Sequence, residues 1–591
     1  MRKAISTALL SLTAVAAGAQ TMYDGLTFSQ NNYYGTARSI GMGNAMTAVG
    51  GDLGSIGINP AGSAVAGYSQ FTITPNLTLS SMNSSYSAYP VGGVDKFVNE
   101  QGKNLTRFSL PNFGATFNWN LGNRSGLKSI TYGIVVNGTN NFTGKMLAGG
   151  VNDKTSYISA MAVGANGFHS GFLNGHLDGK GNKIDIRDNA YYENDDRNMP
   201  APWNAIVNAQ AGAIVNYGNS SDPNYAYRYV AATEMCRPVT EQEVNDGYYT
   251  LGEGEYIKDG VVMDKDGNGI YSLSLGGPLN QAYGRKVTGS KYDALFNVGF
   301  NFSETFFVGV NLGVTSLNYN YDEYFKEAAA NPDNFEIEFG EKGITRFSDY
   351  RTRYSYTADG SGVYGKFGFL WRPIDGIRVG AAVQTPTIME INERWIQDVN
   401  VNLNYTDASF HGSAKTPEGE YSYRLRSPYR LNAGAAFTFA GMALVSADYE
   451  MTDYSTMKFM SKDGGWSNDT FSSLNDQIRN CMGVSHMVRV GAEFKPLPEI
   501  AVRAGYNFTT TPEYVYEGNS KTKLNDRINA FSVGLGYSSN GSFFADIAAR
   551  MTMLADEYIS PYADYLSDLA SPMILNKRDI YNVTATFGWR F

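Results

Sequence analysis

The sequence is poor in the residues that metal centres, disulfide frameworks and nucleic-acid interfaces need. It has 2 cysteines and 4 histidines among 591 residues, which supports neither a metal cluster nor a disulfide framework. Its net charge is −9 and no basic stripe is present, which argues against a nucleic-acid partner. No nucleophile–base arrangement stands out either. We therefore expect no enzyme activity, no catalytic residues, no metal and no cofactor.

Long apolar runs are also missing. Beyond the N-terminal leader no stretch reaches 18 apolar residues, so a membrane-spanning helix is excluded. A spanning β-strand needs only about 9–11 residues of alternating character, so a β-barrel is still allowed. The leader itself has Arg2 and Lys3, a small apolar core and an Ala17-Gly18-Ala19 cleavage site. Residues 1–19 are thus predicted to be a signal peptide, with Gln20 first in the mature chain and no lipoprotein cysteine behind it.

What the sequence has in abundance is glycine, tyrosine and phenylalanine, with 65, 41 and 32 copies. Such enrichment without long apolar runs favours many short strands. The clearest strand is the C-terminal one, where odd-numbered apolar residues from Tyr581 to Phe591 alternate with polar ones. The same period of two predicts fourteen strands, at 71–79, 113–121, 130–136, 294–302, 306–314, 363–371, 377–383, 429–439, 443–451, 488–494, 500–508, 531–537, 543–551 and 581–591.

The connections between these strands alternate in length. Short turns are expected at 122–129, 303–305, 372–376, 440–441, 495–499 and 538–542, and long loops between them, the largest at 139–291. An outer-membrane barrel requires that alternation, with an even strand number, short periplasmic turns and longer outer loops. A soluble β-sandwich has no reason to place every long loop at one end. We therefore predict an all-β, 14-stranded antiparallel transmembrane barrel over residues 68–591, with residues 351–362 and 385–403 extending its wall outward.

A glycine-rich segment at 35–62 precedes the first strand. Glycine recurs at about every third or fourth residue, and Ile40, Met42 and Met46 lie between the glycines. The segment ends in Asn59-Pro60-Ala61-Gly62. Glycine permits close backbone approach but disfavours regular helix or strand, so such a segment needs a container. The alternative is a flexible linker, although linkers favour serine over regularly spaced apolar residues.

The strand parity that turns apolar residues outward turns a glycine inward on nearly every strand. Strand-interior glycine often marks the close approach of another backbone. We therefore expect residues 20–67 to form a hatch that plugs the lumen and enters from the turn end. The alternative is that these glycines only relieve curvature in a narrow barrel. They are Gly133, Gly299, Gly309, Gly368, Gly380, Gly434, Gly491, Gly505, Gly534 and Gly588.

Taken together, the glycine-rich segment with its Asn59-Pro60-Ala61-Gly62 ending, the fourteen strands and the terminal Phe591 resemble the FadL-like outer-membrane transporters. The resemblance implies uptake of long-chain fatty acids or aromatic hydrocarbons, a hatch inside the barrel, a lumenal ligand pocket and a lateral opening near a kinked third strand. It also implies a monomer in the Gram-negative outer membrane, surrounded by lipid and lipopolysaccharide. Gly138 at the end of the third strand could break the ladder.

Parity also selects candidate ligand-binding residues. It turns Lys366, Arg378, Arg489, Arg503, Arg550 and Arg590 inward, together with Asp448, Glu450, Glu493 and Asp546. A fatty acid needs a cation for its carboxylate and an apolar wall for its tail. Arg550, furthest from the turns among the arginines, is the first candidate, with Lys366 second. The apolar wall would come from Val135, Phe307, Leu444 and Phe544, while the alternative is that the charges pair with each other and with the hatch.

In the largest loop, Trp203, Ile206 and Val207 share one predicted helical face with Ala211, Ile214 and Val215, and Pro202 suits the first turn. This face is either a landing site for hydrophobic ligand or a helix that packs the loop over the barrel mouth. The run from Asp264 to Gly269 resembles the start of a calcium loop but has Leu275 where glutamate is needed, which favours a tight turn. Cys236 and Cys481 both fall in outer loops, where a disulfide is permitted.

The function expected from these features is passive uptake of a hydrophobic molecule, such as a long-chain fatty acid, across the outer membrane. Two alternatives are kept open. One is a docking component of a secretion machine, which would present its loops to partners and need no apolar lumen. The other is a haemin-binding receptor, for which four scattered histidines are thin support.

Overall fold

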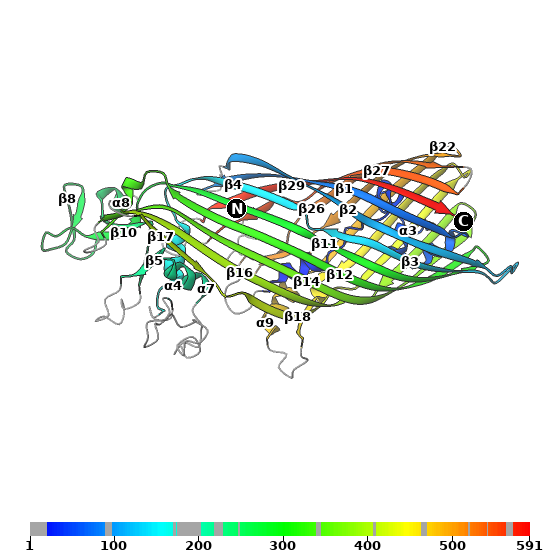
Figure 1. The fold of residues 1–591 in the computed structure, drawn as a ribbon, viewed down its shortest axis with the longest axis horizontal. Coiled ribbons are helices and arrows are strands. Elements are labelled where there is room, and N and C mark those ends of the chain that lie inside the picture. Colours follow the sequence, from blue (N-terminus) through cyan, green and yellow to red (C-terminus); the bar gives the residue numbers. More distant parts are fainter. Residues whose placement is uncertain are drawn as a thin grey trace.

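The computed structural model describes residues 20–88, 97–168, 173, 202–217, 228–245, 249–338, 344–405, 409–462, 470–517, 520–539, 542–562 and 571–591. Its main feature is a closed barrel of fourteen antiparallel strands (Figure 1). The last strand pairs with the first through Gln70↔Arg590 to Ser87↔Met573, which closes the wall. In order, the strands are β1 (Gln70–Ser87), β2 (Val98–Asn120), β3 (Leu127–Asn141), β11 (Leu279–Phe302), β12 (Phe306–Ala329), β14 (Ile344–Ile374), β15 (Ile377–Gln384), β19 (Arg430–Phe439), β20 (Ala443–Asp453), β22 (Val484–Leu497), β23 (Ile500–Thr510), β26 (Arg527–Ser538), β27 (Phe543–Met553) and β29 (Met573–Arg590). All fourteen predicted strands are therefore confirmed.

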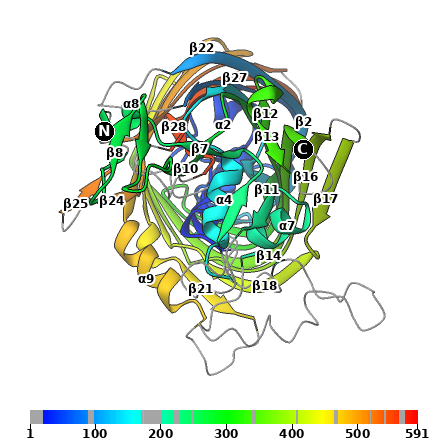
Figure 2. The same ribbon diagram turned by 90° about the vertical axis from the view of Figure 1, so that its left-hand side faces the viewer.

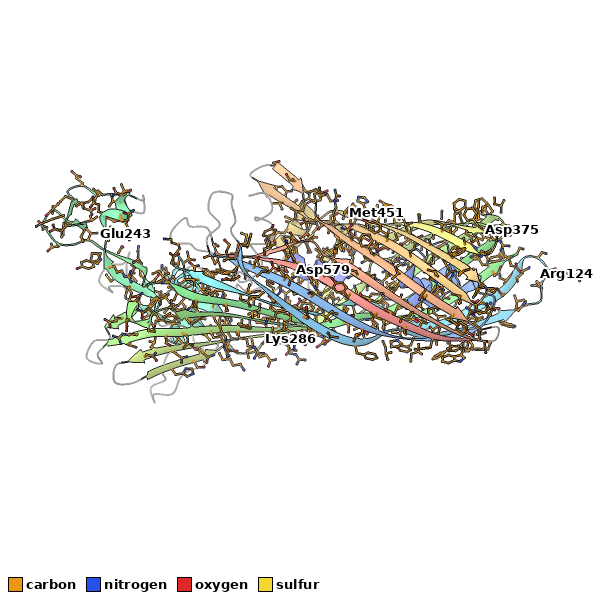
Figure 3. All side chains as sticks on the ribbon, turned by 90° about the horizontal axis from the view of Figure 1, so that it is seen from above. Arg124, Glu243, Lys286, Asp375, Met451 and Asp579 are labelled. Carbon is orange, nitrogen blue, oxygen red and sulfur yellow. The ribbon has the colours of Figure 1, made fainter. Side chains whose placement is uncertain are left out.

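Short turns gather at one end of the barrel and long connections at the other. Only Asp375 and Gly376 separate β14 from β15, and three residues separate β11 from β12. Figure 3 shows Arg124 and Asp375 at the turn end and Glu243 at the opposite, outer end. The predicted signal peptide, residues 1–19, lies outside the described residues.

Side chains on the outer face of the wall are apolar toward the turn end. On β29, Tyr581, Val583, Phe587 and Trp589 are exposed, while Asn582, Thr584 and Thr586 between them are at most 1% exposed. The same alternation of exposed apolar and buried polar residues runs around the barrel and includes Phe71, Phe117, Trp371, Phe437 and Phe531. Such an apolar surface is unfavourable in water and suits the hydrocarbon of a bilayer. Closure of the barrel leaves no strand edge whose backbone N–H and C=O groups would lack hydrogen-bond partners in lipid. This exterior places the chain in a Gram-negative outer membrane.

Beyond the apolar belt the wall continues outward. β14 is 31 residues long, and β16 (Ile388–Tyr405) continues the line of β15, which confirms the predicted extension. β4 (Gly144–Asn152) continues β3 against the outer half of β11. The predicted bounds of the largest loop, 139–291, are therefore wrong at both ends, since β3, β4 and β11 occupy 139–141, 144–152 and 279–291. Outside the membrane the outer face of a strand need not be apolar. The alternation of apolar and polar residues, from which the strands were predicted, therefore ends where the apolar belt ends.

The remaining elements lie in the outer part and in the lumen. Figure 2, viewed from the outer end, shows α4 (Tyr157–Ala165) and α7 (Trp203–Gln210) within the ring of strands. The shorter outer elements are β5 (Ile214–Asn216), β6 (Tyr229–Ala231), β7 (Glu234–Pro238), α8 (Glu241–Asn245), β8 (Tyr256–Lys258), β9 (Val261–Met263), β10 (Tyr271–Leu275), η3 (Pro332–Asn334), β13 (Glu336–Glu338), β17 (Ser409–Lys415), β18 (Gly419–Arg426), η5 (Tyr454–Thr456), β21 (Lys458–Ser461), α9 (Ser472–Cys481), β24 (Tyr514–Glu517), β25 (Ser520–Lys523) and β28 (Glu557–Ile559). None of the described helices is long and apolar enough to cross a membrane.

The outer extension has a core of its own around α4. The carboxylate of Glu327, on β12, accepts hydrogen bonds from the backbone N–H of Tyr157 at 2.7 Å and the hydroxyl of Ser156 at 2.8 Å. A carboxylate at a helix N-terminus satisfies amides that have no partner within the helix. Burial raises the pKa of Glu327 to about 7. This contact fixes α4 to the wall above the lumen.

Candidate functional site

The residues before the first strand form a plug inside the barrel. They fold as α1 (Met22–Ser29), α2 (Ala37–Gly41), α3 (Leu53–Ile56) and the 3₁₀ helix η1 (Pro60–Val65), and Figure 1 shows them within the strands. α1 lies in the outer half, where Phe28 joins an apolar cluster with Leu425 and Phe459. The segment ends at the turn end, where Ser69 bonds to Phe591. The expected entry from the turn end is thus corrected: the described plug starts in the outer half and runs down to that end.

The inward glycines receive the plug backbone. Built onto Gly491, a Cβ would overlap the carbonyl of Met42; built onto Gly380 or Gly309, it would overlap Thr47 or Pro60. Gly299, Gly368, Gly434, Gly505 and Gly534 also face plug atoms at close range. The predicted close approach of the plug is therefore confirmed for eight of the ten inward glycines. These eight glycines are called the plug seat below.

The other two glycines were wrongly assigned to the seat. Gly133 faces Thr116 and Asn297, and Gly588 faces the ring of Phe544, so both contact the wall rather than the plug. The register explains why the remaining glycines act together. Gly309 lies directly opposite Gly299 on one side and Gly368 on the other, and Gly491 lies opposite Gly505. Glycines paired across neighbouring strands therefore leave space for the plug backbone at the same height in the barrel.

Barrel cations hold the carbonyl groups of the irregular plug backbone. Lys366 Nζ donates to Gly57 O at 2.8 Å, and Arg378 Nη1 donates to Val49 O at 2.9 Å. Lys291 Nζ donates to Phe28 O and Gln30 O at 2.9 and 2.6 Å, and Arg430 donates to Ser29 O. A backbone outside helix and sheet must find partners when buried, and these cations supply them.

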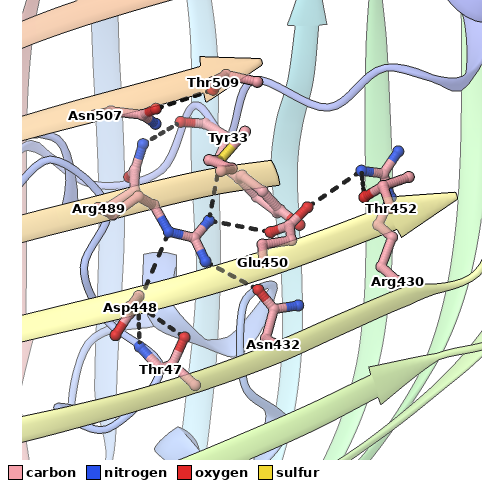
Figure 4. A network of polar contacts seen from close by, with 12 residues as sticks. Tyr33, Thr47, Arg430, Asn432, Asp448, Glu450, Thr452, Arg489, Asn507 and Thr509 are labelled. Carbon is pink, nitrogen blue, oxygen red and sulfur yellow. Dashed lines mark hydrogen bonds and ion pairs between the residues drawn. The ribbon is translucent and has the colours of Figure 1, made fainter. Parts of the chain in front are cut away.

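Ion pairs link the same wall to the plug (Figure 4). Arg489 is fully buried and lies 3.1 Å from Glu450 and 3.9 Å from Asp448. Asp448 in turn accepts from the amide and hydroxyl of Thr47, at 2.8 and 2.7 Å. On the plug, Arg38 pairs with Glu493 at 2.9 Å, and Glu493 also pairs with Arg503. The alternative expected for the lumenal charges, pairing with each other and with the hatch, is what these groups do.

The six predicted ligand-binding residues are all buried against the plug or its surroundings. Arg550 Nη1 lies 3.3 Å from Asn32 O and 3.4 Å from Tyr33 O, and its guanidinium covers the ring of Tyr34 at 4.7 Å. Val135 packs against Leu53 and Ile56, Phe307 against Ala61 and Ala64, and Leu444 within the cluster of Met42 and Met46. Phe544 lies under Arg590 and beside Gly588. With Lys366 on Gly57, five of the six contact the plug directly.

The predicted hatch residues lie where that seat needs them. Ile40, Met42, Met46, Pro60 and Gly62 are buried. Asn59 is fully buried, and its side-chain amide donates to Thr47 O at 2.7 Å and to Phe369 O on β14 at 3.0 Å. The one side chain thus ties two parts of the plug to the wall.

The ladder between β2 and β3 stops partway up the wall. The last pair in the described chain is Asn112↔Asn137; above it β2 pairs with β1, and β4 pairs with β11. At this break the plug itself bonds to β3. Asn32 N donates to Thr139 O at 2.7 Å, and Tyr34 N donates to Gly138 O at 2.8 Å. The ladder stops just before Gly138, the position at which the sequence suggested a break and which faces Pro111, and residues 32–34 lie behind the gap.

A small cavity lies behind the break. Its lining includes Tyr33, Tyr34, Gly138, Leu295 and Tyr364, and its free volume is about 10 Å³, the room for a single water. Sites for drug-sized ligands measure about 300–1,000 Å³, so this cavity has no room for such a ligand. Sequence reasoning missed Lys291, which fell inside a predicted loop, and Arg430, which strand parity would have turned inward.

The structure does not contain the continuous helical face predicted for residues 203–215. α7 ends at Gln210, and Ile214 and Val215 belong to β5, so the six residues do not share one helical face. Pro202 is the N-cap rather than a first-turn residue. Ile206 and Val207 are each 1% exposed in the core that includes Val399 and Val401, and Trp203 packs against it. A strand pairing with Ala231 and Val230 overrides the helical spacing at 214–215.

Two further expectations concern the outer loops. Residues 264–269 form the expected tight turn, in which Asp264 accepts from the amides of Asp266 and Asn268 at 2.8 Å. No group of three or more His, Cys, Asp or Glu side chains suited to a metal occurs in the described part of the chain. Cys236 and Cys481 are both free, so the disulfide left open by the sequence is not formed.

No protein-family model and no curated protein sequence matches this chain. Solved structures of similar architecture do. A Pseudomonas aeruginosa FadL homologue has 11% identity and a TM-score of 0.45, with 95% of this chain and 99% of that chain covered. The Pseudomonas putida toluene transporter TodX has 11% identity and a TM-score of 0.43, covering 94% and 98%. The Ralstonia pickettii toluene transporter TbuX has 11% identity and a TM-score of 0.40, covering 95% and 99%. The chain resembles FadL-like transporters.

Proposed function

We propose that this barrel is an outer-membrane channel for passive uptake of hydrophobic molecules such as long-chain fatty acids. The observation that carries the proposal is the plug segment bonded to β3 at the break between β2 and β3. The proposed ligand is a small apolar molecule that comes from the surrounding lipid or lipopolysaccharide layer. The proposed transporting unit is a monomer, because the break, the plug and the lumen all belong to one chain.

The surroundings of the break suit an apolar ligand. On the outer face Phe108, Leu110, Phe113 and Ile134 are exposed around it. On the inner face Tyr33, Tyr34, Leu295 and Tyr364 stand beside polar residues that include Asn137 and Asp293. An apolar molecule that moves from lipid through this place keeps apolar surface on both sides and avoids the cost of exposure to water.

Opening requires residues 32–34 to leave Gly138, because the cavity behind them holds no more than a water. That movement would also release Arg550 from the carbonyls of Asn32 and Tyr33. A freed guanidinium beside an apolar path is suited to a carboxylate, which argues for a fatty acid over a neutral hydrocarbon. Val135 and Leu295, opposite each other in neighbouring strands, would line the path of the tail.

A disulfide between plug and wall tests the gate. The Cβ positions of Tyr34 and Gly138 are 3.3 Å apart, close to disulfide geometry. In a background with Cys236 and Cys481 changed to Ser, we expect oxidised Tyr34→Cys/Gly138→Cys barrels in proteoliposomes to stop taking up labelled oleate, and reduction to restore uptake.

The matched control joins β3 to β2 by a disulfide instead of joining it to the plug. Ala115 and Ile134 face each other in the ladder below the break, so Ala115→Cys/Ile134→Cys joins β2 to β3 and leaves residues 32–34 free. This variant should take up oleate in both redox states. Continued uptake by the oxidised plug staple would overturn the proposed route.

A further inference from the structure

Two carboxylates in the outer half of the lumen face no cation in the described chain. Glu393, on β16, is 0% exposed and accepts hydrogen bonds from the hydroxyls of Tyr356 and Tyr423 and from Gln20 Nε2 at 2.8 Å. Asp24, in the first turn of α1, accepts only from the amide and hydroxyl of Thr21. No described lysine or arginine forms an ion pair or hydrogen bond with either carboxylate.

Some other buried carboxylates of the described chain have cations as partners, whereas others, such as Glu327, are held by hydroxyl and amide donors. Glu450, Glu493 and Asp546 each pair with at least one arginine. Glu393 lies beyond the apolar belt, and burial, reinforced by the negative charge of Asp24, raises its pKa to about 7. Burying a carboxylate is costly unless a charge compensates it. A positive group in this place would therefore favour ionised Glu393.

Gln20 lies between the two acids. Its side chain reaches Glu393, and the peptide nitrogen that follows it, Thr21 N, donates to Asp24 at 2.8 Å. The residue is only 9% exposed. We propose that the α-ammonium group of Gln20, set free when the leader is removed after Ala19, binds in this site as a cation shared by Glu393 and Asp24.

The proposal rests on leader cleavage at the predicted position and is independent of what the channel transports. Before cleavage the nitrogen of Gln20 is a neutral amide; afterwards it is a cation on the residue whose side chain contacts Glu393 and whose neighbour Thr21 contacts Asp24. Maturation would thus add a charge-assisted contact that fixes the outer end of the plug. The Gln20 end is anchored in this way while the 3₁₀ helix η1 is held by the glycines at the turn end.

The first experiment measures whether the α-amine is protected. Mature barrels purified from outer membranes are treated with a small amine-acylating reagent, and the N-terminal peptide is quantified by mass spectrometry. We expect native Gln20 to react slowly while the exposed Lys577 reacts freely. Glu393→Gln and Asp24→Asn should each accelerate acylation of Gln20, by about tenfold for the loss of a charge-assisted contact.

The matched control is Glu390→Gln. Glu390 lies on the same strand but pairs with Lys462 on the outer surface at 2.7 Å, so the same substitution there should leave acylation of Gln20 unchanged. A native α-amine that reacts as fast as Lys577, or equal rates in the wild type and both lumenal variants, would overturn the proposal. So would a mature N-terminus at another residue. Strand content measured by circular dichroism shows whether each variant is folded.

The second experiment uses the chemistry of an N-terminal glutamine. A free α-amine attacks the side-chain Cδ, a C–N bond forms and ammonia leaves, which yields a neutral lactam. Because both groups are held by the acids, intact mass should show Gln20 uncyclised in the wild type and Glu390→Gln, and progressively lighter by one ammonia in Glu393→Gln. Rapid cyclisation in the folded wild type would contradict the ion pair, whatever the outcome of the oleate assay.

Discussion

The inner and outer halves of the lumen hold the plug by different means. In the inner half, backbone groups of residues 42–60 lie directly on strand glycines, and Lys366 and Arg378 donate hydrogen bonds to the carbonyls of Gly57 and Val49. In the outer half, Leu26 and Phe28 of α1 pack among aromatic rings that include Tyr423, Phe459 and Phe471. The inner half fits by shape and polar contacts, whereas the outer half adds apolar packing of α1 to the hydrogen bonds from Lys291 and Arg430.

The difference indicates which part of the plug can move. A backbone seated on glycine has no side chain to rearrange, so a small shift creates overlap or leaves a buried carbonyl without a donor. Apolar side chains can separate from a cluster at a cost that scales with area. Residues 31–35 lie between α1 and the part of the plug held by glycines, and they line the break. The proposed gate, residues 32–34, is therefore next to the rigid part of the plug.

The largest effect is expected where the shape fit is tightest. In Gly491→Leu the new side chain would overlap Met42, so we expect the plug to leave its seat. Residues 35–62 should then be cleaved by protease added from the turn side. Gly365→Leu, whose glycine meets nothing closer than a Thr385 methyl at 3.9 Å, is the control and should stay protected. Loss of barrel stability with the plug still protected would instead favour the curvature explanation.

Removal of a buried charge should have the next largest effect. Arg489→Met leaves Asp448 and Glu450 with one cation fewer, and breaking a buried pair on one side costs about 3–5 kcal/mol. Thermal denaturation in detergent should show a clear fall in the midpoint. The triple variant with Asp448→Asn and Glu450→Gln should recover part of it; no recovery would mean that Arg489 acts through packing alone.

In the outer half, truncation should release only α1. Phe28→Ala removes a fully buried ring that packs edge-on against Tyr319 at 5.4 Å, at a cost of about 3–5 kcal/mol. Hydrogen exchange followed by mass spectrometry should show faster exchange in residues 22–30 and none in 42–60. Equal acceleration in both segments would show that the two halves are one cooperative unit.

The smallest effect concerns the ligand. Arg550→Ala should weaken binding of a fatty acid by about 1.5–3 kcal/mol, the worth of a hydrogen bond to a charged group, and barely affect its methyl ester. Calorimetry with both ligands measures the difference. Equal losses would assign Arg550 to the plug, where it already binds Asn32 and Tyr33.

Much of the fold could be predicted because the membrane imposes a simple period. Odd-numbered residues of β29 face lipid and even-numbered ones the lumen, so parity alone turned Arg550, Lys366 and the glycines of the plug seat inward. The wall beyond the belt was less predictable, since β4 and the outer half of β11 have no lipid to face. For the same reason Lys291, which holds α1, was hidden in a predicted loop.

The sequence by itself determined the barrel and the existence of a plug, because alternation in a strand and the spacing of glycines are local properties. Only the tertiary structure decided what each inward group touches. Parity gives the face of a side chain but neither its height nor its partner, and those partners are far apart in sequence: Gly491 with Met42, Arg550 with Tyr33, and Glu393 with Gln20. The closure of β29 on β1 makes the wall a ring around the plug, which brings these distant partners together.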